Sequence, residues 1–236
     1  MTATLIGVGV GPGDPELLTL RALRTLREAD RVVAPSVSAD TEGRAESIVR
    51  RAAPGLAVDR VPFEMAAGAA ARVETARKAA VTILGWLDQT PRVAFVTLGD
   101  PNVYSTFSAI ASEVRALDPT VTIETVPGIM AFQDLAARAG TVLLDDVESL
   151  TLVTALDGPA AAVEALADPR RAVVVYKGGR HVPAIVRALE DAGRLDGAVL
   201  GELLGLPGER IAPVREAAEG SVSYLATIVV PPRSAG

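Results

Sequence analysis

Residues 7–20, with the sequence GVGVGPGDPELLTL, decide the fold of this chain. They begin within a short uncharged apolar run, residues 2–10, which is typical of a buried strand in a parallel sheet. Glycines on both sides of a proline then let the backbone turn sharply and let another segment or a ligand approach it closely. Asp14 or Thr19 can cap the helix that the pattern predicts over residues 16–29.

A dinucleotide-binding loop is the first alternative for such a turn, and its spacing does not match. That fingerprint needs glycine at its first, third and sixth positions. Counted from Gly7 the sixth position is Pro12, and counted from Gly9 it is Asp14. The acidic residue expected at the end of the second strand is also missing, because Asp30 precedes that strand. The sequence therefore disfavours a dinucleotide site.

Composition and charge exclude several other classes of function. The 236 residues are 49% hydrophobic and 22% charged, so the chain can bury a full core. A net charge of −6 disfavours a nucleic-acid partner. With no cysteine and one histidine, neither a disulfide framework nor a protein-built metal site is expected. No apolar run approaches the roughly 18 residues that span a bilayer, so we expect a cytoplasmic protein with no membrane partner.

The order of predicted elements indicates an α/β fold with two domains. In the first half, strands alternate with helices, which predicts a mostly parallel sheet. The predicted strands are residues 2–10, 31–35, 57–61, 93–98 and 121–126, and the predicted helices are 16–29, 44–53, 65–88 and 104–117.

The second half predicts a mixed sheet. Its expected strands are residues 149–155, 171–176, 197–203, 209–214 and 224–230, with helices around 132–137, 160–167 and 181–192. The last two strands are close enough in sequence to pair antiparallel across a turn at Gly220. Element order places the boundary between domains of residues 1–125 and 126–236.

Four loops share one property, since each follows a buried strand and is rich in glycine, proline and small residues. They are residues 11–14, 98–101, 126–129 and 177–179. In an open parallel sheet, ligands bind outside the carboxyl ends of the strands. Glycines there offer backbone donors and acceptors to a nucleoside-like group. A free phosphate fits less well, because Asp14 and Asp100 carry negative charge.

Three segments resemble, in order, the motifs of the tetrapyrrole (class III) methyltransferases. They are GVGVGPGDPELLTLRALRTLREADRVVAP, LGDPNVYSTF and TVPGIMAFQDLAA, and the resemblance extends over residues 5–230. The opening motif, YSTF, and the later KGGRHVPAIVRALEDAG and LPGERI are most similar to the branch that methylates C(20) of precorrin-2. The family implies S-adenosyl-L-methionine as methyl donor, a homodimer, and an active site in the trough between two α/β domains. It further implies a small-molecule tetrapyrrole substrate and a role in cobalamin biosynthesis.

Donor-binding residues follow from the resemblance position by position. They are Pro12, Leu98, Gly99, Asp100, Val103, Ser105, Thr106, Met130, Ala131, Thr154, Ala155 and Lys177. Many relatives have an apolar residue where Lys177 stands. Relatives often have serines where Met130 and Ala131 stand, which favours backbone contacts at these two positions.

Methyl transfer from a sulfonium is a direct displacement, so the protein mainly aligns the reactants in a dry site. The acceptor carbon of a reduced tetrapyrrole is nucleophilic by itself, and no catalytic triad or metal is needed. Asp100, Tyr104 or a water can accept the departing proton. His181 can serve as a base, contact a substrate carboxylate or cap a helix.

Three other functions stay open at this point. A sister methyltransferase can act on the cobalt-loaded substrate or on another ring carbon. An RNA ribose methyltransferase of the same family would show a basic face, and a nucleotide-binding module without activity would fail to bind the donor.

Overall fold

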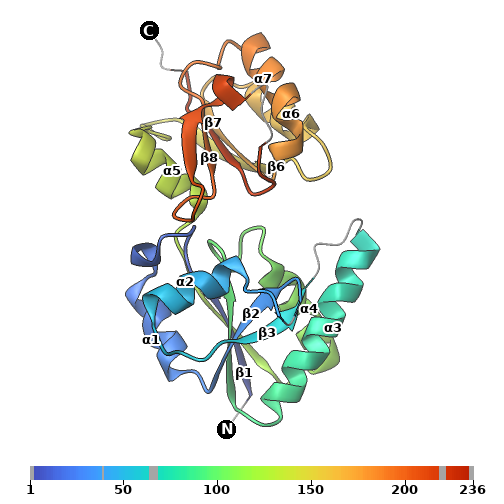
Figure 1. Cartoon of the computed structure of the whole chain (residues 1–236). Helices are drawn as coiled ribbons and strands as arrows, with labels where there is room; N and C mark the ends of the chain where they lie inside the picture. Colours follow the sequence, from blue (N-terminus) through green and yellow to red (C-terminus); the bar gives the residue numbers. More distant parts are fainter. Residues whose placement is uncertain (1–2, 39, 64–68, 218–221, 234–236) are drawn as a thin grey trace. The chain divides into compact units, whose positions relative to one another are not determined.

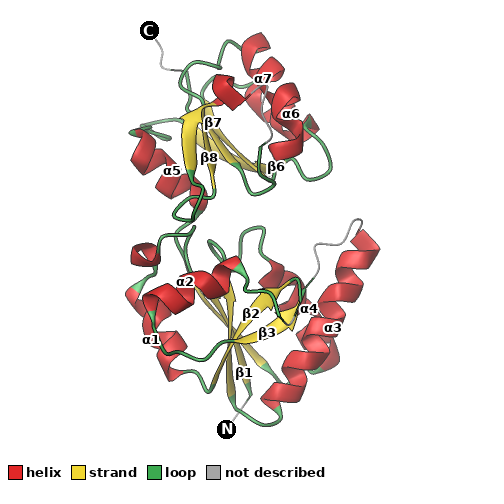
Figure 2. Cartoon of the chain, in the orientation of Figure 1, coloured by secondary structure: helices red, strands yellow, loops and turns green. Residues whose placement is uncertain are grey.

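The computed structural model describes residues 3–38, 40–63, 69–217 and 222–233. The chain divides into two compact units, residues 1–130 and 131–236, drawn in Figures 1 and 2. The predicted domain boundary, between residues 125 and 126, falls before the last residue of strand β5 (Thr122–Val126). The observed division, after residue 130, falls at the start of helix α5 (Ala131–Ala139). In the described part of the chain, no helix has both the length and the apolarity to cross a membrane.

Unit 1 contains a five-stranded parallel sheet in the order β3-β2-β4-β1-β5. Its strands are β1 (Thr4–Gly9), β2 (Arg31–Ser36), β3 (Asp59–Pro62), β4 (Arg92–Thr97) and β5 (Thr122–Val126). Its helices are α1 (Leu20–Glu28), α2 (Arg44–Ala52), α3 (Ala69–Leu87) and α4 (Thr106–Leu117), with a 3-10 turn η1 (Pro15–Leu17). The predicted strand–helix alternation is confirmed.

Helices cover both faces of this sheet, as Figure 1 shows. Alternate residues of a strand point to opposite faces, so Ile6 and Val8 pack in the core beneath α1 and α2. Leu5 packs in the core beneath α3 and α4. Gly7 points to the same side, where a β-carbon would lie 2.4 Å from the ring of Phe107. The absence of a side chain at Gly7 therefore lets α4 pack closely against β1.

The helix predicted over residues 16–29 is present as α1, but its predicted start is wrong, because a separate 3-10 turn occupies Pro15–Leu17 and α1 begins at Leu20. Asp14 Oδ1 accepts the backbone N–H of Glu16 at 2.9 Å and caps η1. Thr19 Oγ1 accepts the N–H of Ala22 at 3.1 Å and caps α1. Both expected caps are used, one for each element, and the extended Leu18 separates them. The first residues of the helix predicted over 65–88, residues 65–68, lie outside the described residues.

Unit 2 contains the mixed sheet, in the order β6-β7-β10-β8-β9. Its strands are β6 (Ser149–Thr154), β7 (Arg171–Tyr176), β8 (Val199–Glu202), β9 (Arg210–Pro213) and β10 (Thr227–Val230). Its helices are α5 (Ala131–Ala139), α6 (Ala160–Leu166) and α7 (Val182–Asp191), with 3-10 turns η2 (Gly179–His181) and η3 (Val214–Ala217). Two α/β units with a parallel and a mixed sheet confirm the predicted fold class.

The predicted pairing of the last two strands is wrong. β8 lies between β9 and β10 and pairs antiparallel with both, and β10 also pairs antiparallel with β7. The apolar sequence of β10, buried at all four positions, suits the centre of the sheet better than a terminal hairpin. The expected turn residue, Gly220, lies outside the described residues.

Candidate functional site

The connections that leave β1 and β4 run in opposite directions. β1 connects through α1 to β2 on one side, and β4 connects through α4 to β5 on the other. β1 and β4 are adjacent in the sheet. In open α/β sheets, ligands bind outside the carboxyl ends of the strands at such a switch point. The topology therefore predicts a ligand site at the loops that follow β1, β4 and β5.

Three glycines bring these loops into direct backbone contact. A β-carbon on Gly9 would lie 2.4 Å from the carbonyl oxygen of Gly99 and 2.7 Å from the nitrogen of Gly128. A β-carbon on Gly128 would lie 2.1 Å from the same oxygen and 2.8 Å from the Gly9 Cα. We call this contact of Gly9, Gly99 and Gly128 the glycine crossing. No side chain larger than hydrogen fits at Gly9 or Gly128 without moving the neighbouring backbone.

Backbone hydrogen bonds reinforce the crossing. The Gly99 N–H donates to the Gly11 carbonyl at 2.8 Å, and the Val10 N–H donates to the Thr97 carbonyl at 2.9 Å. Gly11 and Gly99 both have positive φ angles, 81° and 63°, which glycine adopts at little cost. Among the described residues, and apart from the chain neighbours of Gly99, a β-carbon there would meet one atom within 4 Å, the Met130 Cα at 3.9 Å. The backbone at Gly99 therefore faces space that a ligand can fill.

The side chain of Asp100 links the loop after β4 to the loop after β5. Asp100 Oδ2 accepts the N–H of Gly128 at 3.1 Å, and Oδ1 accepts the N–H of Asn102 at 2.8 Å. The Asn102 side-chain amide donates to Thr125 Oγ1 at 3.3 Å. Asp100 thus connects the loop after β4 to the loop after β5, and Asn102 connects the loop after β4 to β5 itself.

The end of the β4 loop is fixed by the cap of α4. Ser105 Oγ accepts the Phe107 N–H at 3.0 Å and lies 2.9 Å from Thr97 Oγ1. Tyr104 precedes this cap with φ 49°, a left-handed conformation that is costly for a residue with a side chain. Its side chain is exposed. Thr106, a predicted site residue, is the first residue of α4.

A second group of predicted site residues lies in unit 2, at the carboxyl ends of the parallel pair β6 and β7. Thr154 is paired with Tyr176 at the end of these strands. The buried Ala155 donates its N–H to the Tyr176 carbonyl at 2.9 Å. Lys177 follows with φ 58°, and a β-carbon on Gly178 would lie 3.6 Å from the Ala155 Cβ. The structure thus brings Thr154, Ala155 and Lys177 together.

The predicted site residues accordingly form two groups, one in each unit. The first contains Pro12, Leu98, Gly99, Asp100, Val103, Tyr104, Ser105, Thr106 and Met130, which stand in the loops after β1, β4 and β5 or at the first residue of α4. The second contains Ala131, Thr154, Ala155 and Lys177. That both groups contribute to one site in a trough between the units stays a prediction.

Three further residues, Asn102, Thr125 and Arg51, contribute contacts that the sequence does not predict. Asn102 and Thr125 carry no recognisable signal, because their contact joins residues far apart in the chain. Arg51 of α2 donates from Nη1 to the Gly13 carbonyl at 3.3 Å. Arg51 on α2, the helix that follows β2 in the chain, therefore helps to hold the first glycine loop.

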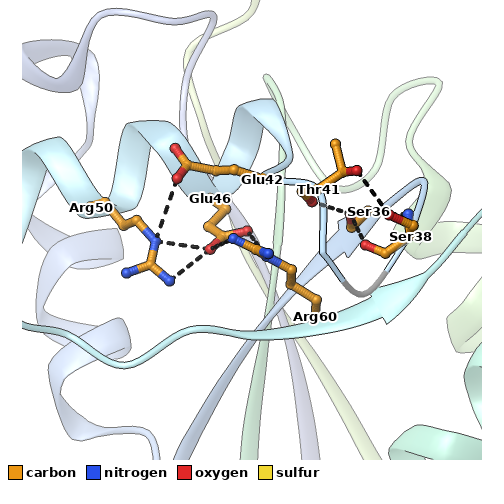
Figure 3. A network of polar contacts seen from close by, with 7 residues as sticks. All are labelled: Ser36, Ser38, Thr41, Glu42, Glu46, Arg50 and Arg60. Atoms are coloured by element: carbon orange, nitrogen blue, oxygen red, sulfur yellow. Dashed lines mark hydrogen bonds and ion pairs between the residues drawn. The ribbon is translucent and has the colours of Figure 1, made fainter.

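An ion-pair network around the buried Glu46 holds α2 against β3 (Figure 3). The Glu46 side chain is fully buried and accepts from Arg50 Nε at 2.8 Å and from Arg60 Nε at 2.7 Å. Burial alone would raise the pKa of Glu46. The hydrogen bonds and positive charges of Arg60 and Arg50 outweigh burial and hold this pKa below its ordinary value. The network fixes the helix that carries Arg51.

The sequence profile of the tetrapyrrole (corrin/porphyrin) methylases matches residues 4–218. The chain belongs to this family. The expected family membership is confirmed, and the glycine crossing of unit 1 lies entirely within the matched region.

Several sequence relatives align with most of this methylase. It is 30% identical to a precorrin-2 C(20)-methyltransferase of Sinorhizobium sp., over 96% of this chain and 94% of that protein. It is 29% identical to a cobalt-precorrin-2 C(20)-methyltransferase of Salmonella typhimurium, over 89% and 87%. It is 30% identical to the cobalamin biosynthesis protein CobIJ of Mycobacterium tuberculosis over 97% of this chain, and it spans about half, 46%, of that longer protein.

Solved structures share the fold. The cobalamin-synthesis-related protein CobF of Corynebacterium diphtheriae superposes with a TM-score of 0.73 at 23% identity, over 98% of this chain and 99% of that one. The uroporphyrin-III C-methyltransferase of Thermus thermophilus, solved with S-adenosylhomocysteine, gives a TM-score of 0.65 at 25% identity, over 97% and 92%.

Proposed function

We propose that this methylase transfers a methyl group from S-adenosyl-L-methionine to C(20) of precorrin-2 and so forms precorrin-3A in cobalamin biosynthesis. The similarity to the Sinorhizobium enzyme over 94% of its length supports the acceptor. The Thermus relative solved with S-adenosylhomocysteine supports the donor.

The observation that carries the proposal is the glycine crossing at the switch point of the parallel sheet. Apart from its chain neighbours, the nearest described atom to the Cβ position of Gly99 is the Met130 Cα at 3.9 Å, whereas Gly9 and Gly128 admit no side chain. Such a site offers backbone N–H and C=O groups, which suit the nucleoside and amino-acid parts of the donor. The residues present therefore fit this ligand, and Pro12, Leu98, Gly99, Val103 and Met130 would hold it from unit 1.

The chain's own contribution is alignment. When bound, the donor would supply a methyl group on a sulfonium sulfur, whose carbon–sulfur bond breaks with its electron pair going to sulfur, so that neutral S-adenosylhomocysteine leaves. The acceptor carbon of the reduced tetrapyrrole supplies the electron pair of the new carbon–carbon bond and afterwards loses a proton. Fixing the two reactants in line accounts for much of the rate of such a displacement. A locked backbone is suited to this task. We further propose a homodimer, as in the family resemblance.

A cobalt-loaded acceptor is the second candidate, favoured by the similarity to the Salmonella protein. One experiment separates the two. The protein is incubated with methyl-labelled donor and either precorrin-2, cobalt-precorrin-2 or uroporphyrinogen III, and the labelled carbon is located by NMR. We expect label at C(20) of precorrin-2. Label at another carbon, or turnover of the cobalt form alone, would contradict the proposal.

A further inference from the structure

Both carboxylate oxygens of Asp100 already accept backbone hydrogen bonds, and the two donors lie in different loops. The Asn102 N–H, two residues along, forms a local turn with Oδ1 at 2.8 Å. The Gly128 N–H, in the loop after β5, reaches Oδ2 at 3.1 Å. One side chain thus spans from the loop after β4 to the loop after β5.

The second of these bonds ends on the glycine crossing. Gly128 is the residue whose Cβ position is closed off by the backbones of Gly9 and Gly99. Hydrogen bonds to a charged acceptor are about twice as strong as neutral ones. The Asp100–Gly128 bond therefore holds the third loop in register with the other two. A proton taken from the substrate by Asp100 would neutralise this charged acceptor and so weaken the bond that holds Gly128 at the crossing.

We propose that Asp100 is a positioning residue for the donor site and not the acceptor of the substrate's proton. This inference rests on the proposed function. It leaves Tyr104 or a water to receive the proton from the methylated carbon. Asp100 acts through Gly128, whose backbone it orients.

Two variants test this role, Asp100→Asn and Asp100→Ser. Asparagine has a single acceptor oxygen, and serine retains the local turn but lacks the second oxygen. The matched control is Asp118→Asn. Asp118 forms the same kind of local turn, accepting the Thr120 N–H at 2.9 Å, but lies between α4 and β5, before that strand begins.

Three measurements are made on the full chain. Titration calorimetry gives the Kd of S-adenosylhomocysteine, steady-state kinetics gives kcat at saturating donor, and hydrogen exchange reports the amides of residues 128–130. For both Asp100 variants we expect a Kd raised at least tenfold, a kcat within tenfold of wild type, and faster exchange at Gly128. We expect no change in the Asp118 variant.

The opposite pattern would overturn the inference. If Asp100 accepts the proton, kcat falls by about a hundredfold or more, with Kd and exchange unchanged. A Kd within tenfold of wild type, or a kcat lowered more than tenfold at saturation, excludes a positioning role. If the wild-type protein itself binds no S-adenosylhomocysteine, it is the proposed function that fails. Exchange at Gly128 then still decides whether Asp100 holds the loop.

Discussion

Gly128→Ala tests whether the glycine crossing is needed for donor binding. Alanine suits the backbone there, since Gly128 is not among the residues with positive φ, and the effect is therefore steric. The added methyl would lie 2.1 Å from the Gly99 carbonyl oxygen and must retreat to at least 3.4 Å for an ordinary contact. Its other near neighbours are backbone atoms of Gly9, so no flexible side chain can move aside.

The magnitude follows from this geometry. Overpacking costs about 1–3 kcal/mol, and rigid neighbours place this variant near 3 kcal/mol. A displacement of about 1 Å in a positioning element can cost a factor of about a hundred in rate. We therefore expect unit 1 to lose about 3 kcal/mol of stability and donor affinity to fall at least tenfold. Marginally stable domains have about 5–15 kcal/mol in total, so the variant still folds.

Trp86 makes the assay specific for unit 1. It is the chain's single tryptophan, and it packs against the core of unit 1 with the Arg31 guanidinium 5.1 Å from its ring centre. Urea unfolding followed by its fluorescence should shift by about 1.5 M for a typical slope of about 2 kcal/mol per M. Calorimetry with S-adenosylhomocysteine gives the affinity.

Gly85→Ala is the matched control. Gly85 lies in α3, and outside that helix's own backbone no atom of the described residues is within 4 Å of its Cβ position. Replacing a helical glycine by alanine stabilises by up to about 1 kcal/mol, so this variant should gain stability and keep its donor affinity. Donor binding of Gly128→Ala equal to that of Gly85→Ala would refute the role of the crossing.

Four further predictions follow from the same structure. Gly99→Val should abolish donor binding, because a branched residue is strained at φ 63° and its side chain would enter the space proposed for the donor. Retained donor affinity in a variant whose circular dichroism spectrum matches that of wild type would count against this. Glu46→Gln should cost about 2 kcal/mol at pH 7, below the 3–5 kcal/mol typical of a broken buried pair, because Arg50 and Arg60 reach water. Since the pKa of Glu46 is lowered on folding, its contribution to the free energy of unfolding is complete above the ordinary pKa of 4.5 and is lost as the pH falls through the lower folded-state pKa. Urea unfolding should therefore show a smaller stability difference between wild type and Glu46→Gln at pH 3 than at pH 7. His181→Gln should lower kcat less than tenfold, or about 1.4 kcal/mol; a hundredfold loss with unchanged substrate affinity would identify a base. EDTA should leave the rate unchanged, because displacement at a sulfonium needs no Lewis acid; lost activity that added metal restores would contradict this.

The sequence predicted most strands to within one or two residues, because apolar runs and the glycine and proline that end them are local signals. It failed where local signals compete or where partners are distant. Residues 16–29 contain two possible caps, and the structure uses both. The strands β9 and β10 are consecutive and resemble a hairpin, yet β8 separates them.

In the candidate site too, the sequence predicts the local features but not the contacts between distant residues. The glycine-rich loops were predictable, since glycine and proline end buried strands visibly. The contact of Gly9 with Gly128 was not, because it joins two loops more than a hundred residues apart. The roles of Asp100 and Arg51 depend on which backbone group each side chain reaches. A sequence shows that a carboxylate or guanidinium is present but not what it holds.

Asp100, which the sequence offers as a catalytic residue, belongs instead to the framework that links the loops of unit 1. A displacement reaction with a nucleophilic acceptor and a good leaving group requires alignment more than acid–base assistance. The proposed donor site in unit 1 has a framework of backbone contacts, with glycines at the contacts, one carboxylate between loops, and Arg51 on a helix that Glu46 anchors. Substitutions in this framework should weaken donor binding before they slow the chemistry. Substitutions of Tyr104 or His181 should affect the acceptor or its proton instead, so the two sets of variants separate in Kd and kcat.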